Sequence, residues 1–153
     1  NFIQMKTRQS LKMILAVLAL STGVFAKAQD DVVITSSQLP KTAQAFIKKN
    51  FSSPILQATK DYDYGIISEY QVYLEDGTKL DFNRSGVWKE IENKHMGIPF
   101  SAVPAKIAAY IKQKFPGTKV LEIDKKRYGY SVKISNGLEL EFSSSGAFLR
   151  IDD

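Results

Sequence analysis

The sequence lacks cysteine and contains a single histidine, His95. Without cysteine there are no disulfide bonds, no thiol nucleophile and no thiolate metal ligand, so the hydrophobic core must hold the fold. No serine stands in a nucleophile-elbow motif, and a lone histidine does not support a catalytic dyad or triad. We therefore predict that the protein is not an enzyme, and we interpret His95 as a solvated linker residue.

Acidic residues are absent from the first 28 positions, which carry four of the 21 basic side chains. The rest of the chain, with 17 basic and 16 acidic side chains, is close to neutral. The formal charge of +5 therefore belongs to the leader, and it does not indicate a nucleic-acid partner.

The leader has the order of segments that is typical of a secretory signal. From Met5 a basic segment precedes an apolar run and then Ala26-Lys27-Ala28. A membrane anchor is the alternative, but the apolar run is shorter than the about 20 residues that cross a bilayer, and polar residues interrupt it. We predict a signal peptide over residues 1–28 and a periplasmic or secreted protein with no membrane span after cleavage.

A stretch of twenty residues occurs twice in the remaining chain. Residues 72–91 recur as residues 132–151 with seven identical positions, whereas unrelated stretches would share only about one or two. In each copy a glycine follows Asp76 or Asn136 between alternating apolar and polar residues, which predicts a tight β-hairpin turn. We interpret the stretch as an internal duplication built from antiparallel strands.

Each copy is predicted to begin with a helix and to continue with four strands. The first helix opens at Ser37 and runs to about Phe51, and the second opens at Ser101. The predicted fold class is α+β: two tandem helix-plus-four-antiparallel-strand repeats in two layers, with the helices on one face of the sheet. At 153 residues the chain has room for one domain. We place it at residues 29–153, with repeats at about 37–92 and 101–153 and a linker at 93–100.

Two motifs carry a resemblance to a known family. Both copies contain L/V-P-x4-A-[FY]-I-K-x2-F, from Leu39 and Val103, and D/N-G-x2-L-x-F-x2-S-G, from Asp76 and Asn136. Together with the leader, these residues resemble the PepSY-like proteins exported by bacteria, which share the fold of the beta-lactamase inhibitory protein. The resemblance implies a joined sheet with a concave face, the surface that the inhibitor uses to hold its target enzyme. This chain lacks the inhibitor's paired cysteines, so the target does not transfer.

Aromatic residues are the candidate partner-binding residues. Tyr73 is out of phase with the apolar residues of its strand, as are Trp88 and Phe148, which predicts that all three lie on the outer sheet face. Exposed tyrosine and tryptophan are enriched at protein interfaces. The alternative for Trp88 and Phe148 is that they fill the seam between the repeats. The other candidates lie at the first hairpin of each copy: Tyr62, Tyr64 and Tyr128.

Charged motifs have simpler interpretations. Asp61-x-Asp63 with Glu69 offers oxygen ligands for calcium but lacks a calcium-loop pattern, so we interpret it as a solvated hairpin. The pairs Glu90/Glu92 and Glu139/Glu141 each share a sheet face, and we interpret them as exposed strand positions rather than a glycosidase pair. We predict no metal site and no cofactor, and we interpret Lys125-Lys126-Arg127 as a solvated strand end.

These features predict an exported, non-catalytic binding module. Its expected partner is a protein or peptide of the cell envelope, held on the exposed sheet face, with enzyme inhibition as one form of that role. The alternative function is an envelope sensor that binds a small ligand or a metal ion.

Overall fold

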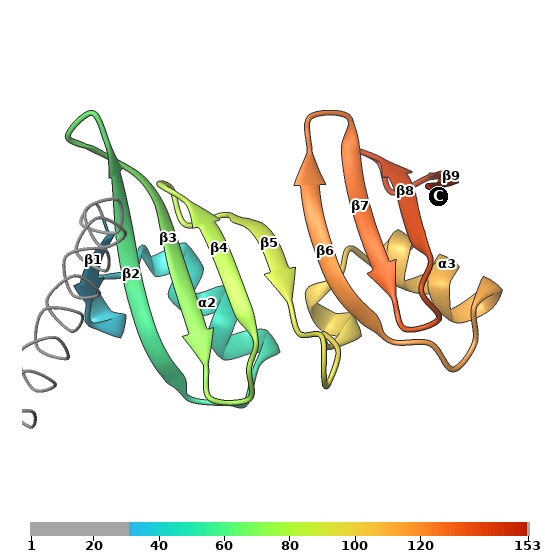
Figure 1. Cartoon of the computed structure of the whole chain (residues 1–153), viewed down its shortest axis with the longest axis horizontal. Helices are drawn as coiled ribbons and strands as arrows, with labels where there is room; N and C mark the ends of the chain where they lie inside the picture. Colours follow the sequence, from blue (N-terminus) through green and yellow to red (C-terminus); the bar gives the residue numbers. More distant parts are fainter. Residues whose placement is uncertain (1–30, 153) are drawn as a thin grey trace, which may run out of the picture. The chain divides into compact units, whose positions relative to one another are not determined.

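The computed structural model describes residues 31–152, so the predicted signal peptide lies outside the described residues. Two α-helices, two short 3-10 helices and nine strands make up this part of the chain (Figure 1). In chain order they are β1 (Asp31–Ile34), η1 (Ser36–Gln38), α2 (Lys41–Asn50), β2 (Ile55–Asp63), β3 (Ile66–Leu74), β4 (Lys79–Asn83), β5 (Trp88–Glu92), η2 (Phe100–Ala102), α3 (Ala105–Lys114), β6 (Val120–Lys126), β7 (Gly129–Ile134), β8 (Glu139–Ser143) and β9 (Phe148–Asp152).

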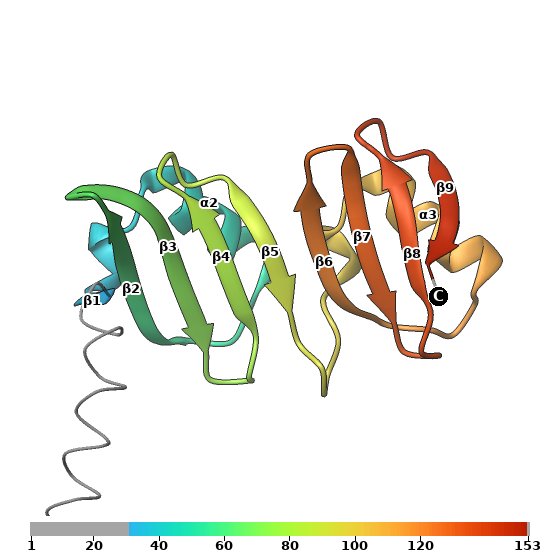
Figure 2. The same cartoon turned by 45° about the horizontal axis from the view of Figure 1, so that its top comes forward.

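Within residues 31–152 the strands form one nine-stranded sheet, and their order in the sheet is their order in the chain. Every neighbouring pair from β2 to β9 is antiparallel. Helices α2 and α3 lie on the same face of this sheet (Figures 1 and 2). We call the opposite face the outer face.

The predicted fold class is wrong. The strands do not form two tandem helix-plus-four-strand repeats, because a single sheet runs through the described chain, β1 precedes the first helix, and the two α-helices have only ten residues each. The mixed α/β character is correct. The join between β5 and β6 explains the difference, since it places Ile91 opposite Ile123 and leaves neither side chain exposed. Burial of two isoleucines favours a continuous sheet over separate units.

The two helices are amphipathic and bury their apolar side against the sheet. Ala43 and Ile47 of α2 are buried, and the ring of Phe46 meets that of Phe82 edge-on at 6.2 Å. In α3, Ile107 and Ile111 are buried. Each helix starts directly after a proline, which lacks the N–H that would otherwise need a partner there.

The sheet contributes the largest part of the core. Alternate residues of β4 and β8 point to the helices and are fully buried: Leu80, Phe82, Leu140 and Phe142. Complete burial of one such side chain stabilises a fold by about 1.5–3 kcal/mol. Their neighbours Lys79, Asp81, Glu139 and Glu141 therefore point to the outer face, which is where a site can form.

The turn between β4 and β5 packs against the start of α2. Gly86 has a φ of +84°, and a Cβ built there would lie 2.6 Å from the Cβ of Pro40. Gly146 repeats the arrangement after β8, where a Cβ would lie 2.9 Å from that of Lys106. Only glycine fits both the backbone conformation and the space at these turns.

Candidate functional site

The outer face carries a group of five carboxylates where β4, β5 and β6 lie side by side. Cross-strand pairing aligns Asp81 with Glu90, and Glu90 with Asp124. One pair further along, Glu92 lies opposite Glu122. Directly opposed residues of antiparallel strands point to the same face, so all five side chains share the outer face. We call this group the acidic cluster: Asp81, Glu90, Glu92, Glu122 and Asp124.

Three members of the cluster could ligate one cation. Carboxylate oxygens of Glu90, Glu92 and Glu122 all lie within 4.8 Å of one another, and each side chain is partly exposed. Carboxylate oxygens are the ligands that calcium prefers, and they also bind lysine and arginine side chains strongly. The arrangement suits a positively charged ligand.

Lysine side chains form ion pairs with every member of the cluster except Glu90. Lys79 lies 3.4 Å from Asp81, Lys94 lies 3.3 Å from Glu92, and Lys133 lies 3.0 Å from Glu122, while Asp124 pairs with Lys126. Among the described residues, Glu90 has no ion-pair partner. The uncompensated charge is therefore at the centre of the cluster.

Partial burial and neighbouring acids raise the pKa values of two members of the cluster. Partial burial raises the pKa of Glu90, and the charges of Asp81, Asp124 and Glu122 raise it further, against the opposing effect of Lys79. Burial also raises the pKa of Asp81, and Lys79 offsets this only in part. Asp81 is 9% exposed, and its Oδ1 atom has no hydrogen-bond partner among the described residues. A buried polar atom without a partner is uncommon and costs stability.

A second polar group on the outer face lies between β8, β9 and the turn before β7. The buried Glu141 accepts a hydrogen bond from the hydroxyl of Tyr128 at 3.0 Å and forms an ion pair with Nε of Arg150 at 2.8 Å. The hydrogen bond to Glu141 is the main cause that raises the pKa of Tyr128. These residues and Leu149 line a shallow open depression. The charge of Glu141 is satisfied within the protein, so this group stabilises the fold.

The four tyrosines among the predicted contact residues are placed as exposed or partly exposed groups. Tyr73 lies on the outer face, 38% exposed, with its hydroxyl 3.2 Å from Oε1 of Gln71. Tyr64, at the β2–β3 turn, is almost fully exposed, and Tyr128, at the β6–β7 turn, is half-exposed. Tyr62 is partly exposed near the end of β2, with Nζ of Lys60 lying 5.4 Å from its ring centroid. The structure does not gather these tyrosines into one patch, and their role in binding remains a prediction.

The predicted outer-face position of Trp88 and Phe148 is wrong. Both are partly buried on the helix side. Trp88 stacks on Phe46 of α2 at 6.4 Å and meets Tyr130 of β7 at 6.1 Å, so it fills the junction of β5 with the following strands, as the alternative interpretation has it. Phe148 stacks on Tyr110 of α3 at 4.7 Å, away from that junction.

A β-bulge is the physical reason for this error. Asp81 pairs with Glu90, and Phe82 pairs with Trp88, so two residues of β4 lie opposite three of β5. The additional residue reverses the alternation of faces, and Trp88 points to the helices like Ile91. The same irregularity separates Ile151 from Phe148 in β9.

The basic run is also not wholly solvated. Nζ of Lys125 lies 4.4 Å from the ring centroid of Trp88, on the helix side, and partial burial lowers its pKa. A cation over an indole ring is an attractive arrangement. Lys125 therefore contributes to packing at the β5–β6 junction.

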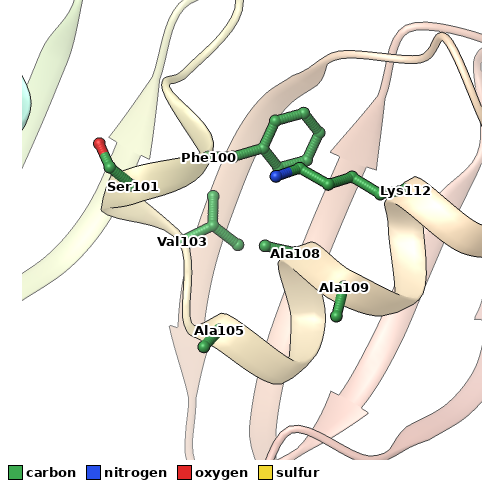
Figure 3. A pocket seen from close by; sticks show the side chains of 7 residues that line it. All are labelled: Phe100, Ser101, Val103, Ala105, Ala108, Ala109 and Lys112. Carbon is green, nitrogen blue, oxygen red and sulfur yellow. The ribbon is translucent and has the colours of Figure 1, made fainter.

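The helix side has an apolar groove along η2 and the start of α3 (Figure 3). Nζ of Lys112 lies 4.7 Å from the ring centroid of Phe100 at one end of it. Its lining consists of Phe100, Ser101, Val103, Ala105, Ala108, Ala109 and Lys112. Apart from Lys112, the lining offers little polar chemistry to orient a ligand.

Sequence reasoning underestimated the acidic cluster. It identified Glu90 and Glu92 as a pair on one face but interpreted them as solvated, and it did not consider Glu122 or Asp124. The triplets Glu90-Ile91-Glu92 and Glu122-Ile123-Asp124 share an acid–isoleucine–acid pattern that could have indicated adjacent strands. The motif at Asp61 and Asp63 does not come together with a third acid in the described residues in the way that the glutamates do.

Comparison with known proteins identifies the family. Residues 68–150 match a family described as "Putative beta-lactamase-inhibitor-like, PepSY-like". The chain belongs to this PepSY-like family. The family predicted from the two repeated motifs is therefore confirmed. A comparison with curated proteins finds no match.

Three solved structures of Bacteroides proteins are similar to this chain. A "putative calcium-regulated periplasmic protein" from Bacteroides thetaiotaomicron is 36% identical, with a TM-score of 0.75 over 82% of this chain and 99% of that chain. Two proteins from Bacteroides vulgatus, each described as a "putative periplasmic protein", are 35% identical, with TM-scores of 0.74 and 0.71. They cover 82% and 80% of this chain and 99% of their own.

These neighbours confirm the predicted periplasmic or secreted location, so this PepSY-like chain is an exported protein. Across residues 31–152 the structure contains no helix with the length and hydropathy of a membrane span.

Proposed function

We propose that this PepSY-like protein is an exported binding protein, without catalytic activity, whose outer face holds a basic segment of a protein partner. The observation that carries the proposal is the acidic cluster at the β4–β5–β6 junction, with Glu90 at its centre and without an ion-pair partner in the described chain. Complementary charge steers association and selects partners.

The geometry suits a lysine or arginine side chain. A cationic group above Glu90 would lie within reach of Glu92 and Glu122, whose carboxylate oxygens already lie within 4.8 Å of those of Glu90. Hydrogen bonds between ionised groups are roughly twice as strong as those between neutral ones. The partner would also relieve the repulsion between acids that adds to the effect of burial in raising the pKa of Glu90.

The environment of Asp81 supports the proposal independently. It lies directly opposite Glu90, is 9% exposed, and has a buried oxygen without a hydrogen-bond partner in the described residues. The buried oxygen therefore costs stability, and the ion pair of Asp81 with Lys79 offsets the burial of the carboxylate only in part. A positively charged ligand on the same face would reduce that cost.

Tyr73 is the aromatic residue best placed to add contact area. It is exposed on the outer face of β3 and pairs with Lys79 of β4, which in turn pairs with Glu92. The family's inhibitor-like description agrees with recognition of a protein. Trp88 and Phe148 are excluded from the proposed contact because they pack against the helices.

Calorimetric titration with two synthetic peptides tests the proposal. A lysine- and arginine-rich peptide should bind, more weakly as salt is added, and an acidic peptide of equal length should not. Glu90→Gln combined with Glu92→Gln should weaken binding at least tenfold, and Tyr73→Ala about fivefold. Glu75→Gln, an exposed acid in the β3–β4 turn, is the matched control and should change little. Equal affinity of the double variant and the wild type would refute the proposed surface.

Calcium is the second candidate ligand. Three carboxylates with oxygens within 4.8 Å offer the ligand type that calcium uses, and a relative with 36% identity is described as calcium-regulated. Calcium binding to the native state would raise the melting temperature. At a calcium concentration a hundredfold above Kd, it adds about 2.7 kcal/mol to the free energy of unfolding.

Thermal unfolding with calcium, and with magnesium as a control, separates the two candidates. A calcium-specific increase in melting temperature that Glu122→Gln abolishes would establish a metal site. If calcium has no effect while the basic peptide binds, the cluster serves a protein partner alone. If calcium and the peptide compete, they share the carboxylates.

A further inference from the structure

Strand β9 forms the outer edge of the sheet. It follows β8 at the end of the strand order, and no strand covers its other side in the part of the chain that the structure describes (Figure 2). Ile151 in β9 is 42% exposed, although it pairs with the buried Leu140. An edge strand offers free backbone N–H and C=O groups to any strand that can align with it.

The same molecule shows how an equivalent edge is covered. Ile91 occupies in β5 the position of Ile151 in β9, since each pairs with a buried leucine two residues before a buried phenylalanine. Strand β6 covers β5 through three residue pairs, with Ile91 opposite Ile123 at the centre. As a result Ile91 has no exposed surface.

We propose that the exposed edge of β9 pairs with β9 of a second copy of this chain, antiparallel and about a two-fold axis. Ile151 would lie opposite Ile151 of the partner subunit, as Ile91 lies opposite Ile123. The sheets of the two copies would then be continuous. This inference goes beyond the proposed cationic ligand and does not depend on it.

Sheet geometry limits the register. Opposed residues of antiparallel strands point to the same face, so a two-fold axis normal to the sheet must pass through a residue position. An axis at Arg150 would oppose two arginines and bring Ile151 opposite Leu149, which lies within the bulge. An axis at Ile151 instead opposes two isoleucines.

Charge complementarity favours the axis at Ile151. In that register Arg150 lies opposite Asp152 of the partner subunit, and Asp152 lies opposite Arg150 of the partner subunit. Each dimer therefore gains two ion pairs on the outer face. Nε of Arg150 lies 2.8 Å from Glu141, and the side chain is 66% exposed, so its terminal amino groups can reach across.

The contact is small. Three residue pairs would form it, the same number that joins β5 to β6. Such a contact buries less surface than a typical stable interface, which buries at least about 1,200 Å². We therefore expect a weak dimer that forms with rising concentration. A closed pair is also the commonest symmetric assembly.

Sedimentation velocity of the exported protein over a concentration series tests the dimer. The wild type should shift from monomer to dimer. Arg150→Asp places two acids opposite each other in a self-pair, and Asp152→Arg places two arginines opposite each other, so each variant alone should dimerise at least tenfold more weakly. An equimolar mixture of the two variants should dimerise again, because both cross-pairs then join an arginine to an aspartate.

Matched controls address folding and general charge effects. Arg84→Asp, in the exposed β4–β5 turn, and Asp63→Arg, at the exposed end of β2, carry the same charge changes and should dimerise like the wild type. Asp152 is exposed and makes no ion pair in the described residues, so Asp152→Arg should keep the wild-type melting temperature. A wild type that stays monomeric would overturn the proposal. So would open-ended growth, a dimer that Asp152→Arg leaves intact, or variants that fail to associate when mixed.

Discussion

Two pairs of residues in equivalent positions of the sheet differ in charge. On the outer face of β4 and β5, Asp81 lies opposite Glu90, so an acid faces an acid. On the outer face of β8 and β9, Glu141 lies opposite Arg150, so an acid faces a base at 2.8 Å. The backbone frame is shared, down to the bulge after each pair.

The difference separates a stabilising contact from a candidate binding surface. Glu141 accepts a hydrogen bond from Tyr128 and forms an ion pair with Arg150. Asp81 retains a buried oxygen without a partner in the described chain, and the pKa values of Asp81 and Glu90 are both raised. Glu90 has no ion-pair partner in the described chain, so its charge is available to an external cation.

The largest expected effect is the loss of stability when Trp88 of β5 is truncated, compared with Phe148 at the equivalent position of β9. Trp88→Ala should lower the free energy of unfolding by about 3–5 kcal/mol, because Trp88 joins Phe46, Tyr130 and Lys125 across the β5–β6 junction. Phe148→Ala should lower the free energy of unfolding by less, since the ring contacts of Phe148 are with Tyr110 of α3 and Phe142 of β8, away from the β5–β6 junction. Urea denaturation measures both. A greater loss in Phe148→Ala would contradict the assigned role of Trp88.

A glycine substitution tests the contact between turn and helix. Gly86→Ala should destabilise the protein by about 2 kcal/mol, since it adds a steric clash with Pro40 to the backbone strain of a φ of +84°. Gly77 has a φ of +90° but open space around its Cβ position, so Gly77→Ala should cost only the backbone strain. Thermal unfolding of both variants isolates the steric part. Equal losses would mean that the turn does not press on α2.

Substitution of the two equivalent acids should have opposite signs. Glu141→Gln removes the charge that holds Arg150 and Tyr128, and it should destabilise by about 1–2 kcal/mol. Asp81→Asn removes a charge that burial already disfavours, and it should be neutral or stabilising by up to about 1 kcal/mol. Chemical denaturation at pH 7 gives both values. Destabilisation by Asp81→Asn would show that the carboxylate is satisfied after all.

The smallest expected effect is on the pH dependence of stability. The pKa of Glu90 is raised in the folded state, so its proton stabilises the fold fully below the usual value of 4.5, and this contribution is lost as pH rises through the raised pKa. Glu90→Gln should therefore gain stability relative to the wild type between about pH 4 and pH 7, by at most about 1 kcal/mol. Melting temperatures across this range measure the gain. A constant difference would contradict the raised pKa.

Local patterns predicted most elements but not the architecture. The periodicity of Leu80 and Phe82, the motif at Leu39 and Val103, and the Asp76-Gly77 turn correctly place strands, helices and a hairpin. The single sheet depends on the β5–β6 pairing, which forms between residues about thirty positions apart. No local signal determines such a contact, because it depends on which other strand pairs with the free edge of β5 and thereby buries Ile91.

The candidate site was predicted less well than the individual helices and strands. Phase alone placed Trp88 and Phe148 outside, because a bulge adds a residue that the alternation of side chains does not reveal. Glu90 and Glu92 were recognised as sharing a face, but their chemistry depends on Glu122 from another strand. A cluster formed by strand pairing cannot be identified until the pairing is known.

The most direct test of the acidic cluster as the binding site is a map of backbone amide chemical shifts as a basic peptide is added. The expected shifts concentrate at Asp81, Glu90, Glu92, Glu122 and Asp124, and they vanish when Glu90 and Glu92 are replaced by glutamine. Shifts centred on the groove at Phe100, on the turn at Tyr64 or on Arg150, and unchanged in that variant, would contradict the account.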